Sequence, residues 1–394
     1  MVAGSAPNPS PSTGREFSFP GAATSRSDWS WALGTALLTW LLTVLAAAPS
    51  LHDFEPERLR QMRSGDYLAM CANPLARTLR EPILAHRILP PTIAWALGGS
   101  VPVSLALPYV ATIGMLALVA LASARRSGRT VGAMAALLVG SSSAVTWPNC
   151  MLGYPDSLAH FLAASLLFFR RPWQVGLICL GGLLCDERFA LALPLVGIWH
   201  AGGPAFGQFF RWFRESAAAL ALAVAGWLLV RHALEAGWVG PGLEKPKLYG
   251  EIYQGVWDFR PWLTGWGVWW LNVLAAYRWC WLLLLAGFAF RWRAGYRWET
   301  AAACSFLAAG TLSTIVVFDV ARSVGFTFLV IPLALCWLAQ AVSSRLLPWG
   351  RSLVWLCYLT PSFLVLTGYF IWCRPLPIRV LAILSGQDPL DWLK

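Results

Sequence analysis

The sequence predicts an all-α membrane protein that crosses the bilayer many times. Of the 394 residues, 57% are hydrophobic and only 12% are charged, which is more apolar surface than one globular core could bury. The mean hydropathy of +0.57 agrees with this composition. The apolar residues also form long unbroken runs, whereas membrane β-barrel strands alternate apolar and polar residues over about 10 positions. The spanning elements are therefore expected to be helices.

The first 28 residues differ from the rest of the chain because they are rich in Ser, Pro, Gly and Ala. A segment of this composition cannot bury enough apolar surface to fold. Residues 1–28 are therefore expected to form a disordered cytoplasmic tail. The apolar run that follows, 29–49, is longer than the core of a typical signal peptide. We interpret it as an uncleaved signal anchor that forms the first span.

Apolar segments follow one another from residue 29 to residue 372. Because a helical crossing needs about 20 residues, this transmembrane domain, 29–372, is predicted to hold about 11 helices. The prolines at 90–91 and 102 predict a surface or re-entrant helix ahead of the second span. The segments are 29–49, 92–124, 131–147, 157–169, 174–185, 189–200, 216–232, 266–290, 299–318, 323–342 and 352–372.

Basic residues predict which loops face the cytoplasm. With a cytoplasmic N-terminus, the loops on that side carry a large excess of Arg, as the positive-inside rule requires. The first loop (50–91), the loop 233–265 and the C-terminal tail (373–394) are then expected outside the cytoplasm, and a bacterial inner membrane is the expected location. The Arg residues on the cytoplasmic side would be Arg15, Arg26, Arg125, Arg126, Arg129, Arg170, Arg171, Arg211, Arg214, Arg291, Arg293, Arg297, Arg345 and Arg351.

Charge and cysteine content argue against several classes of protein. The net charge of +11 does not indicate nucleic-acid binding, because the Arg residues are scattered at helix ends and form no basic stripe or base-stacking module. The nine cysteines include no CxxC pair and lie mostly in apolar segments, where cysteine acts as a small hydrophobic residue. We expect no cofactor, disulfide framework or dedicated metal site, although outer carboxylates could hold Mg²⁺ through water.

The 24 Trp residues are densest between positions 257 and 281. Anchoring at the membrane interface is the ordinary reason for such clusters. The alternative is that some of the rings line a surface for a sugar or an isoprenoid chain, since aromatic faces contact both well.

Four groups of ionisable residues are predicted to lie on the outer face. Each has a structural interpretation: a helix cap, a polar turn or a local ion pair. Their convergence on one face nevertheless favours a lined cavity, in which a carboxylate could act as a base towards an acceptor hydroxyl and Arg side chains could hold a phosphate. The groups are the first loop with Asp53, Asp66, Tyr67, His86 and Arg87; Asp156; Asp186 with Glu187 and Arg188; and Asp319 with Arg322.

The first loop contains three short motifs, Ser64-Gly65-Asp66-Tyr67-Leu68-Ala69, Asn73-Pro74 and His86-Arg87-Ile88-Leu89-Pro90-Pro91. With these motifs the loop resembles that of the GT-C superfamily of integral membrane glycosyltransferases, and of some mannosyltransferases in particular. In that superfamily the first span is followed by a long extracytoplasmic loop with an acidic catalytic residue and amphipathic surface helices. The turn Asp186-Glu187-Arg188 is similar to the polar turn after the fourth span of the family. The resemblance covers the first half of the chain well and the second half only in general layout.

The resemblance implies a hexosyltransferase whose sugar donor is linked to a polyprenyl phosphate. It implies Asp66 or Asp53 as the catalytic base. Family members often have Asp-Glu or Glu-Asp just after the first span, whereas this chain has Asp53-Phe54-Glu55, and Asp66 is preferred. The candidates for the donor phosphate are Arg87, Arg188 and Arg322. The remaining residues expected at the substrate site are Tyr67, His86, Asp156, Glu187 and Asp319.

Two other functions stay open. A transporter or flippase of a lipid-linked or anionic substrate would be favoured by internal repeats and interrupted helices, but no convincing repeat is visible and the charges lie at span ends, with Arg278 a possible exception. A polysaccharide polymerase would place its large loop later in the chain. The expected partners are membrane lipid and a polyprenyl-phosphate sugar donor, and not nucleic acid.

Overall fold

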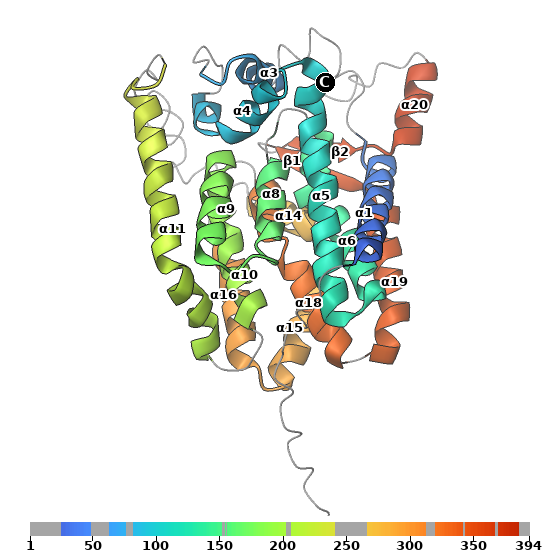
Figure 1. Ribbon diagram of the computed structural model, residues 1–394. Coiled ribbons are helices and arrows are strands. Elements are labelled where there is room, and N and C mark those ends of the chain that lie inside the picture. The colour runs from blue at the N-terminus through green and yellow to red at the C-terminus, as the bar shows by residue number, and fades with distance from the viewer. Residues whose placement is uncertain are drawn as a thin grey trace, which may run out of the picture.

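The computed structural model describes residues 25–48, 63–75, 82–151, 154, 156–201, 206–240, 266–312, 320–341, 343–366 and 369–385. Within these ranges it contains seventeen α-helices, two short 3-10 helices and one two-stranded sheet. The longer helices run roughly alongside one another as a bundle (Figure 1). The prediction of a helical chain is therefore confirmed for the body of the protein.

Among the described residues, three helices are long and apolar enough to cross a membrane: α1 (Arg26–Ala46), α5 (Val101–Ser127) and α11 (Phe206–Glu235). The number rises to five if each of two bent pairs is one span. The first pair, α6 (Arg129–Gly140) and α7 (Ser143–Cys150), bends by 47°. The second, α14 (Trp266–Tyr277) and α15 (Cys280–Arg293), bends by 76°. The prediction of about 11 spans is therefore not confirmed within the described residues.

Many predicted crossings are instead helices shorter than the roughly 20 residues that a perpendicular crossing requires. They correspond to apolar segments expected from the sequence. In α9 the first turn contains Pro172, whose fixed φ suits the start of a helix. These elements are α8 (Asp156–Ser165), α9 (Pro172–Cys185), η3 (Glu187–Ala192), α10 (Leu193–Ala201), α16 (Arg297–Leu312), α17 (Val320–Gly325) and α18 (Val330–Ala341).

A group of short helices, which we call the cap, lies across one end of the bundle (Figure 1). The cap consists of α3 (Arg63–Ala72), η2 (Pro82–His86) and α4 (Leu89–Ala96). Its last member is the helix predicted ahead of the second span, because Pro90 and Pro91 lie in the first turn of α4 and a Gly pair separates α4 from α5. The described part of the first loop therefore contains short helices.

The cap is held against the bundle by close packing. The Tyr67 hydroxyl donates to the carbonyl of Ser104 on α5 at 3.3 Å, and the Tyr67 ring packs with Cys71 and Ala94. Gly99 has a φ of +63°, and a Cβ there would lie 2.9 Å from the carbonyl oxygen of Cys71. Only glycine combines this backbone conformation with such a close approach, so Gly99 allows α3 to lie directly against the α4–α5 turn.

The last predicted span, 352–372, is helical only in its first part. α19 (Ser343–Leu359) ends just before Pro361, and β1 (Ser362–Leu366) then pairs antiparallel with β2 (Tyr369–Cys373). The prediction of a helix over 362–372 was therefore wrong. Proline cannot donate the amide hydrogen that a continuing helix needs, and the aromatic and β-branched residues that follow favour a strand. The C-terminal tail contains one further helix, α20 (Leu376–Leu384).

The outer surface of the bundle is apolar. Large side chains are exposed along α1, such as Leu37, Leu38 and Leu45, and along α11, such as Leu222 and Leu229. Soluble monomers rarely expose contiguous apolar surface on this scale. The packed interior contains very large side chains, including Trp147 and Trp199. An apolar exterior around a tightly packed interior is compatible with a bundle surrounded by lipid.

Candidate functional site

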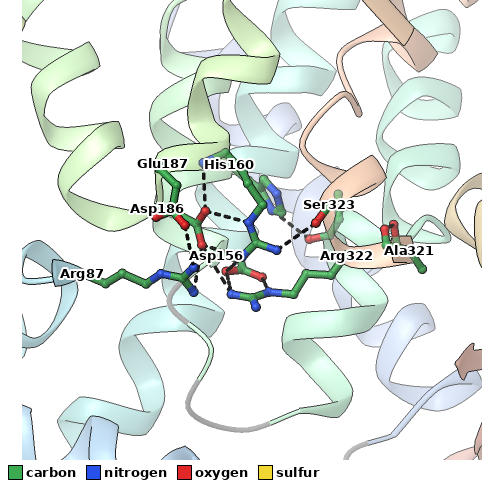
Figure 2. A network of polar contacts seen from close by, with 11 residues as sticks. Arg87, Asp156, His160, Asp186, Glu187, Ala321, Arg322 and Ser323 are labelled. Carbon is green, nitrogen blue, oxygen red and sulfur yellow. Dashed lines mark hydrogen bonds and ion pairs between the residues drawn. The ribbon is translucent and has the colours of Figure 1, made fainter. Parts of the chain in front are cut away.

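Three arginines and two aspartates from separate elements meet in one network of ion pairs, and Figure 2 shows Arg87, Asp156, Asp186 and Arg322 close together. We call Arg87, Asp156, Asp186, Arg188 and Arg322 the charge cluster. Arg87 follows η2, Asp156 opens α8, Asp186 links α9 to η3, Arg188 lies in η3 and Arg322 in α17. Both aspartates are completely buried, and the three arginine side chains are between 2% and 13% exposed.

Arg322 and Asp156 form a two-pronged ion pair. Arg322 Nη2 donates to Asp156 Oδ1 at 2.6 Å, and Arg322 Nε donates to Asp156 Oδ2. The guanidinium also lies over the ring of Tyr154, 4.4 Å from its centroid. Parallel bonds of this kind fix the plane of both partners, so the guanidinium of Arg322 is held in one orientation.

Arg188 and Asp186 form the second two-pronged pair. Arg188 Nε donates to Asp186 Oδ1 at 2.8 Å and Nη2 to Oδ2 at 2.6 Å. The backbone amide of Arg188 also donates to Oδ1 at 3.0 Å, so one carboxylate both caps η3 and orients the arginine. Arg188 Nη1 reaches Ser323 Oγ at 3.1 Å, which connects η3 to α17. The ring of Phe326 lies 5.0 Å from the same guanidinium.

Arg87 is held less tightly than the other two arginines. Its Nη1 lies 3.0 Å from Asp186 Oδ2, and its Nη2 donates to Glu187 Oε1 at 3.3 Å. Its Nε is buried and has no hydrogen-bond partner among the described residues. The side chain of Glu187 is 42% exposed, so this carboxylate lies at the edge of the cluster. Arg87 therefore has donor capacity that the described residues do not use.

The buried part of the charge cluster carries an excess of positive charge. Three guanidinium groups, which stay protonated in proteins, face two buried carboxylates. Arg322 Nη2 also lies 3.4 Å from Asp186 Oδ2, so the charges form one connected network. Burying charge is costly unless it is paired and hydrogen-bonded. The arrangement is therefore suited to an anion with several oxygen acceptors, such as a phosphate.

The two aspartates are poorly placed to act as bases. Both oxygens of Asp156 accept from Arg322, and both oxygens of Asp186 accept from Arg188. A carboxylate engaged in this way binds protons weakly, because protonation would break charge-assisted bonds. Asp156 and Asp186 therefore orient the arginines, and a base must come from another residue.

His160 packs next to the charge cluster. It lies one turn after Asp156 on α8, is 1% exposed, and its Nδ1 is 3.1 Å from the carbonyl of Ala144 on α7. Its ring centroid lies 4.5 Å from that of Phe326, the residue next to Arg188. His160 therefore fixes α8 against α7 and places Asp156, and its hydrogen bond goes to the backbone of α7 and not to the charged groups.

Asp66 and Tyr67 lie in the cap on α3, and both are buried. Burial raises the pKa of the Tyr67 hydroxyl, with smaller contributions from the Cys71 and Cys185 thiols. Cys185 directly precedes Asp186, so this face of α3 lies near the α9–η3 turn. α4 also contacts α9. The cap therefore brings the carboxylate-bearing helix of the first loop to the region of the charge cluster.

His86 points away from the cluster, towards α11. Its Nε2 lies 3.0 Å from Glu235 Oε1, which also accepts from Arg231 Nε at 3.0 Å. Burial lowers the pKa of His86, and the charge of Arg231 lowers it further, against the opposing effects of Glu235 and Glu187. His86 thus connects the cap to α11 and is not part of the anion site.

The structure brings together five of the ten residues predicted for the site, namely Arg87, Asp156, Glu187, Arg188 and Arg322. Asp66 and Tyr67 lie on the cap and His86 faces α11, whereas Asp53 and Asp319 are outside the described residues. The sequence reasoning grouped Asp186 with Glu187 and Arg188 but gave it no role of its own, and it did not include Ser323 or His160. The signal for Asp186 was present, since an Asp two residues before an Arg can bond both its backbone amide and its guanidinium.

Among the described residues, no three His, Cys, Asp or Glu side chains are grouped so that they could hold a metal ion. All nine cysteines are free thiols, and only Cys304 is exposed. The described part of the site therefore offers charged and hydroxyl groups for chemistry.

Comparison with known proteins gives no relative: no protein-family model, no curated protein and no solved structure matches the chain. What the site does must therefore be argued from its own geometry and charge.

Proposed function

We propose that the chain is an integral membrane glycosyltransferase that transfers a sugar from a polyprenyl-phosphate donor to an acceptor hydroxyl. The observation that carries this proposal is the buried excess of positive charge in the charge cluster, beside the cap that bears Asp66. The resemblance of the first loop to the GT-C superfamily agrees with it.

The donor phosphate would bind at Arg87. The unused Nε of this residue and the modest contacts of its Nη atoms leave it able to turn towards a ligand. Arg188 and Arg322 are held in place by their aspartates and by the rings of Phe326 and Tyr154. A phosphate would balance the positive excess and accept hydrogen bonds that are stronger than those between neutral groups.

Asp66 is the preferred base. The acceptor oxygen attacks the anomeric carbon of the sugar, the bond from that carbon to the phosphate oxygen breaks, and the base takes the proton of the acceptor hydroxyl. The leaving polyprenyl phosphate carries the released electron pair, and the arginines stabilise its charge. Asp156 and Asp186 are engaged by arginines, which supports a base from the cap; Asp53 is the alternative.

The apolar exterior of α1 and α11 supports a membrane position for this reaction, where the prenyl chain of the donor would lie in the lipid. The Arg-rich ends of the helices would face the cytoplasm together with the N-terminus. The cap and the charge cluster would then lie at the outer face of a multi-pass protein in a bacterial inner membrane, with about 11 crossings expected from the apolar segments.

A transfer assay tests the proposal. Purified protein in lipid nanodiscs is supplied with radiolabelled sugars on polyprenyl phosphate and with a mixture of glycan and lipid acceptors extracted from bacterial membranes. Transfer of one sugar by the wild type, lost in Arg87→Gln and Asp66→Asn, is the expected result. Donors that bind while no sugar is ever transferred would contradict an enzymatic role.

A transporter of an anionic or lipid-linked substrate is the second candidate. The specific observation in its favour is the pair of broken helices, α6–α7 and α14–α15, which bend by 47° and 76°. Transporters often build their substrate sites from interrupted helices. Counterflow of a lipid-linked sugar in proteoliposomes, without a transfer product, would favour this candidate over the glycosyltransferase.

A further inference from the structure

The turn between α15 and α16 lies at the end of the bundle opposite the cap (Figure 1). α15 ends at Arg293 and α16 begins at Arg297. Gly295 has a φ of +90°, a conformation that other residues adopt with strain. The two helices are thus joined by a tight turn of three residues, and we call the segment 291–299 the arginine turn.

A buried ion pair makes the arginine turn rigid. Arg291 Nε and Nη2 both donate to Glu299 Oε2, at 2.8 and 2.6 Å, and both side chains are less than 10% exposed. The ring of Tyr296 lies 3.4 Å from the same guanidinium. Because Glu299 balances the charge of Arg291, this pair joins α15 to α16 and contributes no net charge to the surface.

The remaining polar and aromatic residues of the arginine turn face outwards. Arg293 and Arg297 are exposed, and the flanking Trp292 and Trp298 are 47% and 59% exposed. The guanidinium of Arg297 lies over the Trp292 ring, 6.0 Å from its centroid. The turn thus presents two positive charges, which no acidic side chain among the described residues pairs with, between two large aromatic rings.

Exposed arginines beside exposed tryptophan rings are suited to the interface between lipid headgroups and acyl chains. Tryptophan rings prefer the boundary between lipid headgroups and acyl chains, and guanidinium groups bind phosphate through paired hydrogen bonds. The start of α9 has a similar combination, where exposed Arg171 precedes exposed Trp173. We propose that the arginine turn is a binding site for the phosphate of an anionic phospholipid headgroup.

The proposal is tested with detergent-solubilised protein and two fluorescent lipids that have the same acyl chains, phosphatidylglycerol and phosphatidylcholine. The wild type should bind the anionic lipid more tightly. Each Arg near an anionic surface contributes about fivefold in affinity, so Arg293→Gln with Arg297→Gln should weaken phosphatidylglycerol binding by about tenfold or more. Phosphatidylcholine binding should change little.

A matched control is the pair Arg211→Gln with Arg214→Gln on α11, which removes the same charge from exposed positions. This control should keep most of the preference for phosphatidylglycerol. Equal binding of the two lipids by the wild type would overturn the proposal, as would an equal loss in the control. Arg293→Lys with Arg297→Lys retains the charge but not the paired hydrogen bonds, and an unchanged preference in this variant would overturn the paired hydrogen bonds to the phosphate.

This test is independent of the proposed enzymatic function, because it measures lipid binding in the absence of any sugar donor. All the substituted side chains are exposed, and such substitutions usually change folding stability little. The melting temperature of each variant checks that the measured difference arises from binding.

Discussion

Arg322 and Asp156 are 166 positions apart in the sequence, yet they form a two-pronged ion pair in which both side chains are almost completely buried. The pair connects α17 to α8 and shares its neighbourhood with Arg188 and Asp186. A buried ion pair is often no more stabilising than apolar residues of the same size. The presence of five such groups at one place is therefore better explained by binding than by stability.

Asp186→Asn should destabilise the fold strongly. Asp186 is the shared partner of Arg188, Arg87 and Arg322, so its neutralisation leaves buried positive charge without compensation. Loss of one partner from a buried pair typically costs 3–5 kcal/mol, and a decrease of about 3 kcal/mol in the free energy of unfolding is expected by denaturation in detergent micelles. Glu187→Gln, at a partly exposed carboxylate, should cost less than about 1 kcal/mol. Similar losses in the two variants would contradict the central position given to Asp186.

Asp66→Asn should slow sugar transfer while leaving donor binding intact. A general base typically contributes between 10² and 10⁴ in rate, so the turnover rate should fall by at least about 100-fold. Asp28→Asn is the control. Asp28 lies in the first turn of α1 and pairs with Arg129, so this variant should keep the wild-type rate. If Asp53→Asn loses the rate and Asp66→Asn keeps it, the base is Asp53.

Acidification should lower the stability of the folded chain through His86, the residue that connects the cap to α11. Burial lowers the pKa of His86, and the positive charge of Arg231 lowers it further. The carboxylates of Glu235 and Glu187 raise the pKa, but only in part offset this decrease. The neighbouring Arg87 also carries positive charge. The unfolded chain therefore takes up a proton first, near pH 6.5. Stability is fully present above that pH and is lost as the pH falls towards the lowered value in the folded state.

The melting temperature between pH 7 and pH 5 measures this effect. The wild type should lose stability across that window, and His86→Asn should lose less. His232→Asn, at an exposed histidine on the same side of α11, should behave as the wild type does. An identical pH dependence in all three proteins would show that His86 does not titrate as described.

Gly99→Ala should loosen the cap. The positive φ and the distance of 2.9 Å to the Cys71 carbonyl both oppose a Cβ at this position, so the packing of α3 must change. Hydrogen exchange in 63–72 should become faster. Gly98→Ala is a matched control, because Gly98 also has a positive φ but nothing lies within 4 Å of its Cβ position. Equal acceleration in both variants would mean that backbone strain, and not the close contact, accounts for the change.

The sequence predicted the class of the fold and the location of the charges for a simple reason. Charged residues next to apolar segments must lie near the ends of those segments, so Arg87, Asp156, Arg188 and Arg322 could be assigned to one face without a structure. The helix α4 was also foreseeable, because its prolines and the glycines after it interrupt a continuous span.

Other features depend on packing that a single sequence does not reveal. The packing of α8, η3 and α17 decides which carboxylate pairs with which guanidinium. The central position of Asp186 among the arginines could therefore not be predicted from the residues next to it in the sequence. Hydropathy located the apolar segments, but it did not distinguish full crossings from shorter helices such as α9. The β-hairpin after Pro361 was missed because its apolar composition is equally compatible with a span.

The most direct test of the central claim is donor binding at Arg87. Thermal stabilisation of the protein in nanodiscs is measured with a panel of polyprenyl-phosphate sugars for the wild type, Arg87→Gln and Arg231→Gln, the last removing a charge outside the charge cluster. A hydrogen bond to a charged group contributes roughly 1.5–3 kcal/mol. One donor should therefore stabilise the wild type and Arg231→Gln alike and bind Arg87→Gln at least about tenfold more weakly. Stabilisation that is equal in all three proteins, or absent for every donor, would contradict a phosphate site at the charge cluster.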